Sequence, residues 1–266
     1  VPAPANSGNI GAEPVMNVPA AKCVYNIYVE NSGSMDGYVK GKTEFEQSVY
    51  SYLSDIKISD ICSEMNLYYI NSKMHKQPSD VADFIEKLEP NTFKAKGGNR
   101  KTTDLSNIIG DILDSHGRDT VSILVSDFVF SPGSGVNADE YLLNQQIGIK
   151  NHFALKQKSN PNLAMMIYQL SSKFEGRYYD RNNTPYNINH QRPFYMLIIG
   201  DSYNLIKLSD EISKDKIKGS GVINSYSLSK AVSSASYGVL AMPKIGSFNP
   251  DPAAPLTSIK GAKIDR

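Results

Sequence analysis

Short apolar runs alternate with helix-patterned segments over most of this 266-residue chain, and this alternation constrains the fold more than any other feature. The runs are largely apolar at both alternating sets of positions, as expected of central strands that are buried on two faces. They lie at 24–29, 67–70, 121–125, 163–170 and 194–199. We therefore predict an α/β fold: a doubly wound, mostly parallel central sheet with helices on both faces.

The segments between these runs carry apolar residues at helical spacing, together with helix start and stop signals. The clearest helix covers 43–56, where Thr43 and Glu46 stand in the arrangement of a capping box. Four further helices are predicted, at about 79–90, 103–117, 138–157 and 202–216. Pro90 is expected to stop the first of these four, and Gly148 to interrupt the third.

Composition sets a domain over 22–230 apart from a segment of different character at each end. Residues 1–21 are rich in Pro, Ala, Asn and Gly, like a leader left by a removed signal peptide, and favour an exported protein: periplasmic, cell-surface or secreted. Residues 231–266 gain Ser, Gly and Pro, and three interpretations stay open: a linker, a wrap over the domain, or the start of a truncated second domain. Within the domain, the polar, Tyr-rich segment 171–193 predicts a projecting hairpin, and 221–228 an edge strand.

The charge balance argues against two classes of partner. Lys and Arg number 28 and Asp and Glu number 27, which leaves a net charge of +1 without any block of like charges. Such a chain lacks the basic patch of proteins that bind nucleic acid or an anionic membrane surface. No apolar run approaches the roughly 20 residues that span a bilayer, so we also expect no membrane span.

The two cysteines, Cys23 and Cys62, each stand just before a predicted strand. Their number excludes a disulfide-dense scaffold and a zinc site of the paired CxxC kind. Two interpretations stay open. If the strands are neighbours, a bridge would close a loop of about 40 residues and add roughly 4 kcal/mol of stability; the alternative is two buried free thiols.

Oxygen-bearing side chains follow the first predicted strand at alternate positions, as Glu30, Ser32 and Ser34 in VENSGSMDGY. Thr103, at the start of a predicted helix, and Asp127, just after a later strand, are expected to reach the same crevice, because open α/β sheets bind ligands at the carboxyl ends of their strands. Hydroxyls and carboxylates without imidazole or thiolate suit a hard divalent cation, Mg²⁺ or Mn²⁺. Taken singly, the same residues have structural interpretations: Ser32 and Ser34 as turn formers, and Thr103 as a helix N-cap.

In this order the residues resemble the metal-ion-dependent adhesion site of the von Willebrand factor type A (vWA) domain. That family has a DxSxS motif after its first strand, a Thr in a later loop, and an Asp after its fourth strand. Here Glu30, Ser32 and Ser34 match the first element, Thr103 matches the second, and Asp127, in LVSDF, matches the third.

The resemblance covers residues 22 to about 210 and departs from the family pattern at two points. Glu30 replaces the first Asp, and its extra methylene pushes the carboxylate further into the crevice. The loop GGNRKTTDL is longer than the usual glycine-threonine loop, which makes Thr102 a rival to Thr103. We favour Thr103, because Leu105 then begins the apolar face of the helix.

The resemblance implies a non-enzymatic adhesion or protein-binding module. In such domains the cation is held by the site residues, and an Asp or Glu side chain of a partner protein completes its coordination. The Glu at position 30 and the longer loop favour an alternative: a scaffold protein whose metal site is vestigial.

A hydrolase is the rival class. The run LIIGDSYN resembles the nucleophile block of the GDS-type esterases, with Ser202 as the nucleophile. These enzymes need a general base and carry a histidine downstream of the block, whereas no histidine follows His190 here. We therefore expect no enzyme, and interpret Ser202 as a helix N-cap.

Two further groups of residues carry side chains that could form sites. The four histidines are scattered over predicted loops and helix ends, which indicates solvent-exposed or core-satisfied side chains rather than a site; they are His75, His116, His152 and His190. The hairpin segment gathers Tyr178, Tyr179 and Tyr186, a candidate contact patch, because tyrosine is enriched at interfaces.

Overall fold

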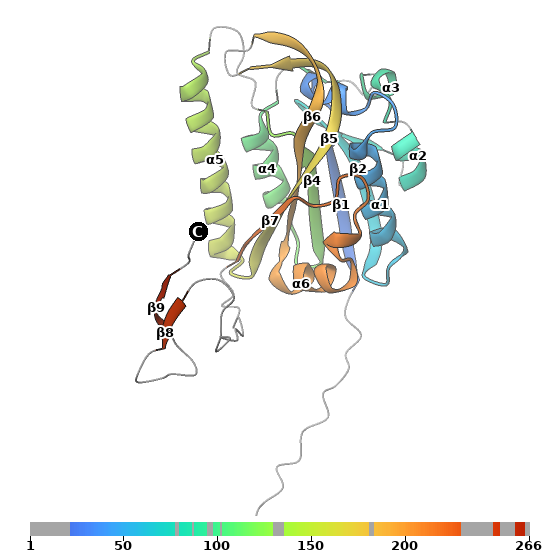
Figure 1. The fold of residues 1–266 in the computed structure, drawn as a ribbon. Helices are drawn as coiled ribbons and strands as arrows, with labels where there is room; N and C mark the ends of the chain where they lie inside the picture. Colours follow the sequence, from blue (N-terminus) through green and yellow to red (C-terminus); the bar gives the residue numbers. More distant parts are fainter. Residues whose placement is uncertain are drawn as a thin grey trace, which may run out of the picture. The chain divides into compact units, whose positions relative to one another are not determined.

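The computed structural model describes nine stretches of the chain, and its fold is drawn in Figure 1. These stretches are 22–77, 80–86, 88–94, 98–101, 103–129, 136–180, 184–229, 247–250 and 259–263. The chain divides into two compact units, Val1–Ala231 and Val232–Arg266. The expected leader, residues 1–21, lies outside the described residues.

A seven-stranded sheet forms the centre of the first unit, in the order β3-β2-β1-β4-β6-β5-β7. Each of the five apolar runs lies within a strand, so these predictions are confirmed. The strands are β1 (Cys23–Glu30), β2 (Cys62–Ile70), β3 (Met74–Gln77), β4 (Thr120–Ser126), β5 (Leu163–Tyr179), β6 (Pro185–Asp201) and β7 (Asn224–Leu228).

The sheet is mixed, and the expectation of a mostly parallel sheet is wrong. Among the described strands, the two parallel pairings are those of β1 with its neighbours β2 and β4. The other four pairings, β2–β3, β4–β6, β5–β6 and β5–β7, are antiparallel. The reason is the hairpin: residues 171–193 are not an insertion between two strands but the distal part of the long β5–β6 hairpin, whose two arms must run in opposite directions.

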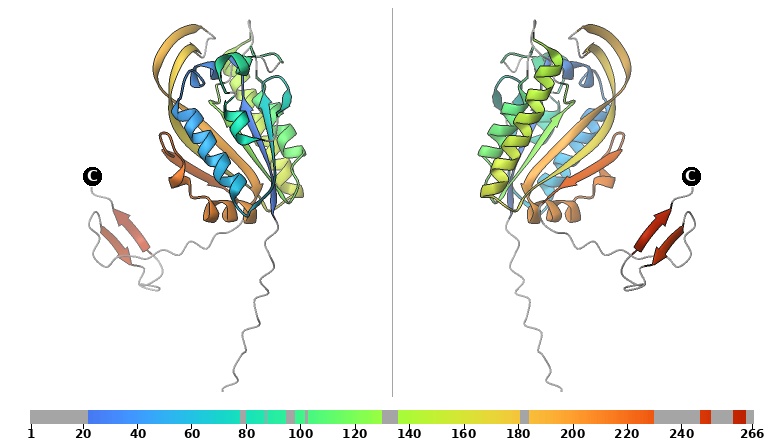
Figure 2. Two further views of the ribbon diagram at one scale, coloured as in Figure 1. Left: turned by 90° about the vertical axis from the view of Figure 1, so that its right-hand side faces the viewer. Right: turned by 90° about the vertical axis from the view of Figure 1, so that its left-hand side faces the viewer.

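Helices cover both faces of the sheet, which confirms the α/β class (Figure 2). On one face lies α1, and on the other lie α4 and α5. The helices are α1 (Glu44–Ile58), α2 (Val81–Glu86), α3 (Pro90–Lys94), α4 (Leu105–Asp114), α5 (Ala138–Ser159) and α6 (Ser202–Glu211), with short 3₁₀ helices η1 (Gly33–Tyr38) and η2 (Lys214–Lys216).

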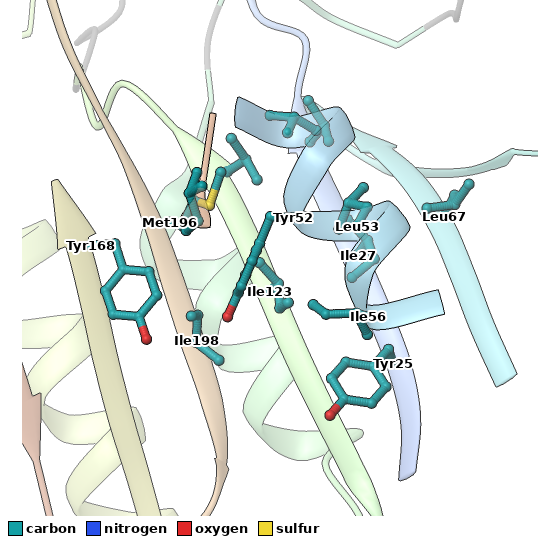
Figure 3. Packing of buried hydrophobic residues seen from close by; sticks show 14 of the residues in the cluster. Tyr25, Ile27, Tyr52, Leu53, Ile56, Leu67, Ile123, Tyr168, Met196 and Ile198 are labelled. Atoms are coloured by element: carbon teal, nitrogen blue, oxygen red, sulfur yellow. The ribbon is translucent and has the colours of Figure 1, made fainter. Parts of the chain in front are cut away.

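Successive strand residues pack into opposite cores, because side chains alternate across a sheet. In β1, Ile27 joins the cluster that contains α1, whereas Tyr28 joins the cluster that contains α4 and α5. Figure 3 shows the α1 side, where Tyr52 and Leu53 lie over residues of β1, β4 and β6. The sheet is therefore buried on both faces in the region that positions the candidate site.

The helix boundaries confirm some signals and correct others. Thr43 caps α1, and its hydroxyl accepts from the Glu46 amide at 3.4 Å, as predicted. Pro90 does not stop a helix: α2 already ends at Glu86, and Pro90 begins α3, where a proline loses no helical hydrogen bond. Gly148 does not interrupt α5, which runs without a break from Ala138 to Ser159. A Cβ at this position would lie 2.1 Å from the Ser106 hydroxyl, so glycine allows α5 to pack against α4.

The edge strand predicted at 221–228 is present as β7. In the second unit, β8 (Ser247–Pro250) and β9 (Ile259–Lys263) pair antiparallel. Among the helices of the described stretches, none has both the length and the apolar character needed to cross a bilayer.

Candidate functional site

The five predicted site residues converge at the carboxyl edge of the parallel strands. Glu30 is the last residue of β1, and Asp127 directly follows β4, so the parallel pairing of β1 with β4 brings the two carboxylates together. Ser32 and Ser34 lie where the chain leaves β1 and enters η1, and Thr103 lies two residues before α4. All five side chains are buried, each less than a tenth exposed.

A chain of hydroxyls connects the first loop to the second carboxylate. The Ser32 and Ser34 hydroxyl oxygens lie 3.0 Å apart, and the Ser34 hydroxyl donates to Asp127 Oδ1 at 3.2 Å. With the Ser34 proton directed to Asp127, the Ser32 hydroxyl is the donor of the first bond. The serines are therefore bonded to one another and across to β4, not turned back onto their own backbone.

Within the part of the chain that the structure describes, three buried oxygens at this site have no hydrogen-bond partner of ordinary geometry: Glu30 Oε1, Thr103 Oγ1 and Asp127 Oδ2. They come from three separate segments of the chain. Leaving a buried polar atom unpaired costs about 1–3 kcal/mol, and more for charged groups, so three such atoms in one place need a physical reason.

Burial raises the pKa of both carboxyls. The pKa of Glu30 is raised mainly by desolvation and further by the negative charge of Asp127, against smaller opposing effects of the nearby Ser126, Ser32 and Thr103 hydroxyls. The pKa of Asp127 is also raised by desolvation, and this effect outweighs the hydrogen bond from the Val129 amide, which lowers the pKa. A cation at this point would relieve both the desolvation and the repulsion.

Ser126 orients Glu30, a role that the sequence did not reveal. The Ser126 hydroxyl donates to Glu30 Oε2 and accepts from the Phe128 amide at 2.8 Å. Asp127 Oδ1 accepts in turn from the Val129 amide at 3.0 Å. These bonds hold a turn in which Phe128 has a φ of 51°, in the left-handed region, and the Val129 amide fixes one oxygen of the Asp127 carboxylate.

Two asparagines and an arginine fix the loop that carries the serines. The Asn31 side chain donates to the Phe93 carbonyl and accepts from Asn71, both at 2.9 Å. The Arg100 side chain donates to the Asn31 and Ser32 carbonyls and also pairs with Asp36. Sequence reasoning missed these partners because each lies dozens of residues away along the chain.

Thr103 is not the N-cap of α4, so its structural interpretation is wrong. The cap is Asp104, whose carboxylate accepts from the Asn107 amide at 3.1 Å and from the Gln145 side chain at 3.1 Å. The Thr103 carbonyl accepts from the Tyr141 hydroxyl at 3.3 Å, so α5 holds this segment from outside. The Thr103 hydroxyl is left for the site; its rival, Thr102, lies outside the described residues.

A cavity of about 350 Å³ opens directly above the serines and Thr103. Its wall combines the cationic side chains of Arg100 and Lys101 with Tyr179, which reaches the site from the β5–β6 hairpin. Figure 1 shows this hairpin arching beyond the ends of β1 and β4. The full lining is Ser32, Gly33, Ser34, Arg100, Lys101, Thr103, Val129 and Tyr179.

The three tyrosines of the hairpin do not form one contact patch. Tyr178 and Tyr186 are partners in the β5–β6 register and share one face, with the Arg192 guanidinium 4.2 Å from the centre of the Tyr178 ring. Tyr179 follows Tyr178 in the strand, so it faces the opposite side and lines the cavity.

Ser202, the candidate nucleophile, begins α6 and has no hydrogen-bonded general base within the described residues. It is the first residue of α6, and the cap is Asp201, so the prediction that Ser202 is the N-cap is wrong. His116 lies near this end of the sheet, with Nε2 3.7 Å from Asp201 Oδ1. Among the described residues, neither ring nitrogen of His116 has a hydrogen-bond partner, so His116 is not hydrogen-bonded to the Ser202 hydroxyl.

Among the described residues, no three or more His, Cys, Asp or Glu side chains are grouped so that they could hold a metal ion. The site at the carboxyl edge has two such side chains and takes its other oxygens from hydroxyls, so it falls outside that pattern. Comparison of the chain with protein-family models, with curated proteins and with solved structures gives no match.

Proposed function

We propose that this chain is a non-enzymatic, vWA-like binding module that holds Mg²⁺ or Mn²⁺ and uses it to bind an acidic group of a partner protein. One observation carries the proposal: three buried, unpartnered oxygens from separate segments, on Glu30, Thr103 and Asp127, gathered with two serine hydroxyls. An exported location, favoured by the composition of residues 1–21, belongs to the same proposal.

The donor set fits a hard divalent cation. Carboxylate and hydroxyl oxygens are the ligands of Mg²⁺ and Mn²⁺, and the described residues put no imidazole or thiolate among them. The residues that would hold the cation are Glu30, Ser32, Ser34, Thr103 and Asp127. When bound, the cation would supply positive charge and open positions for an oxygen ligand.

Glu in place of Asp is compatible with this role, because Ser126 uses the extra reach of the longer side chain. The Ser126 hydroxyl donates to Glu30 Oε2, which leaves Glu30 Oε1 as the free oxygen at the site. The longer side chain thus has one oxygen anchored and one available, like Asp127, whose Oδ1 is bonded while Oδ2 is unpartnered.

The fold around the site supports the same function. The strands β2, β1 and β4 run in parallel, with α1 and α4 on opposite faces, and ligands of open α/β sheets bind at the carboxyl ends of such strands. We propose a vWA-like arrangement for this half of the sheet.

The cavity above the site favours an acidic ligand. Lys101 is exposed at its wall, so a carboxylate that enters meets a positive charge there, whereas the charge of Arg100 is already paired with Asp36. A charge-assisted contact of this kind adds direction and specificity to a protein interface. Tyr179 lines the cavity from the hairpin side and would contact the residues that flank the partner's acidic group.

The test is cation uptake by the full chain. After removal of metal with EDTA, we expect calorimetry to detect binding of Mg²⁺ or Mn²⁺, and the thermal midpoint to rise with the cation concentration. At a hundredfold excess over Kd, binding should add about 2.7 kcal/mol to the free energy of unfolding. The double variant Ser34→Ala, Asp127→Asn should lose both effects. Ser122→Ala, a buried serine of β4 away from the site, should keep them.

No uptake of either ion, or equal uptake by the double variant, would overturn the cation mechanism. A scaffold with a vestigial site is the second candidate, and one observation favours it. The bonds Ser126–Glu30 and Ser34–Asp127 already satisfy one oxygen of each carboxylate without a cation. Its signature is absence of uptake together with partner binding that the double variant leaves unchanged.

A further inference from the structure

Both cysteines lie at the amino edge of the sheet, at the end opposite the candidate site. Cys23 is the first residue of β1 and Cys62 the first residue of β2, and the two are direct partners in the parallel register. Neighbouring strands are about 4.7–4.9 Å apart, which lies within the Cα separation of about 4.4–6.8 Å that a disulfide needs.

An irregularity in the strand pairing creates this partnership. Further along the strands, Tyr25 pairs with Met65, and a regular register would continue to Cys23 and Ser63. Instead the register shifts between Cys23 and Val24, so that Cys62 lies opposite Cys23 and Ser63 is skipped. A β-bulge of this kind re-aims side chains.

The bulge also places both sulfur-bearing side chains on one face. Cys23 is buried in the core cluster on the α1 side, together with Tyr25 and Met65. Regular alternation would send Cys62 to the opposite face, since Met65 is an odd number of residues away. Cys62 nevertheless packs against the same cluster, whereas Ser63 is exposed.

We propose that Cys23 and Cys62 form a structural disulfide that joins the starts of β1 and β2 when the protein folds in an oxidising compartment. In the structure both are free thiols. The two thiols lose two electrons and two protons as one S–S bond forms. The oxidant is a disulfide, either a small molecule such as oxidised glutathione or the disulfide form of a thiol–disulfide oxidoreductase, and it is reduced to two thiols.

Burial predicts when the bond forms. It raises the pKa of both thiols, and the attacking species in thiol–disulfide exchange is the thiolate, so the folded, reduced protein should react slowly. During folding, before the core closes, the same thiols are exposed. The bond should therefore form readily during oxidative refolding and slowly in protein that is already folded.

The experiment is refolding of the full chain from urea in a glutathione redox buffer, followed by alkylation in denaturant and mass spectrometry. We expect a product that resists alkylation and is lighter than the reduced chain by two hydrogen atoms. Reduction should lower its thermal midpoint by about 10 °C, which follows from a closed loop of about 40 residues.

A swap of neighbouring residues is the matched control. The variant Cys62→Ser, Ser63→Cys keeps two thiols in the chain but moves one to the exposed, skipped position, and it should remain alkylatable after the same treatment. A wild-type chain that stays reduced, or a swap variant that cross-links equally well, would overturn the proposal. Cation uptake is a separate readout, because Glu30 lies about 23 Å further along β1.

Discussion

The two halves of the sheet differ in how their strands are connected. In the half built from β2, β1 and β4, strands of at most nine residues run in parallel and end at one edge, where Glu30 and Asp127 meet. In the other half, β5 and β6 form a hairpin with arms of 17 residues each, and β7 adds an antiparallel edge. The parallel order gathers polar groups from distant segments at one edge, whereas the long hairpin extends beyond that edge and brings Tyr179 to the cavity.

The halves meet beside the site, where the hairpin packs on η1. Phe174 of β5 contacts Tyr38 of η1, with ring centres 5.0 Å apart, and the Tyr38 hydroxyl donates to the Pro193 carbonyl at 2.6 Å. At Gly37 a Cβ would lie 2.5 Å from the Phe174 ring, so glycine permits this close approach. The antiparallel half thereby supports the loop that carries Ser34.

The largest expected effect comes from breaking this contact with Phe174→Ala. Phe174 is fully buried and has the Arg192 guanidinium 5.1 Å from its ring centre, so its truncation should cost about 3–5 kcal/mol of unfolding free energy. Tyr186→Ala, on the same hairpin but half-exposed, should change it by less than about 0.5 kcal/mol. Urea denaturation of both variants measures the difference; a cost below about 1 kcal/mol for Phe174→Ala would mean that the hairpin does not support η1.

A smaller loss of unfolding free energy is expected from Gly148→Ala, on the face of the sheet that α4 and α5 cover. The added Cβ would meet the Ser106 hydroxyl at 2.1 Å, and forcing α5 away from α4 should cost about 1–3 kcal/mol. In a Ser106→Ala background the nearest atom is removed, so the cost of Gly148→Ala should fall. Urea denaturation of the four proteins forms a double-mutant cycle, and strictly additive effects would contradict this packing.

Much of the parallel half was predictable because its signals are local. Glu30, Ser32 and Ser34 follow an apolar run, and a parallel pairing is enough to bring them to Asp127. The direction of β6 was not predictable from the sequence, because the apolar run at 194–199 has the same pattern in a parallel and in an antiparallel strand. The turn signal of the hairpin held the missing information, since a hairpin that continues directly into both neighbouring strands makes them antiparallel.

The residues that support the site could not be predicted from the sequence, for a different reason. Ser126, Asn31 and Arg100 act through partners on other elements, and polar residues in loops carry no periodicity that would identify those partners. The cap of α4 shows the limit on a shorter scale. Thr103 and Asp104 are both good capping residues, and only the bond from the Asn107 amide distinguishes them.

The smallest expected effect concerns α1, which joins the two halves through Glu44. This carboxylate accepts from the Lys173 amide of β5 at 2.8 Å, which lowers its pKa below the ordinary value of 4.5. A lowered folded-state pKa means that the bond stabilises the protein above pH 4.5, and that the stabilisation disappears as the pH falls through the lower folded-state value. Glu44→Gln should therefore cost less than about 1 kcal/mol near pH 7, and this cost should shrink steadily as the pH falls below 4.5. Urea midpoints of the two proteins at pH 7 and at a series of pH values below 4.5 test this, and a cost that does not change over the series would assign the effect to packing rather than to charge.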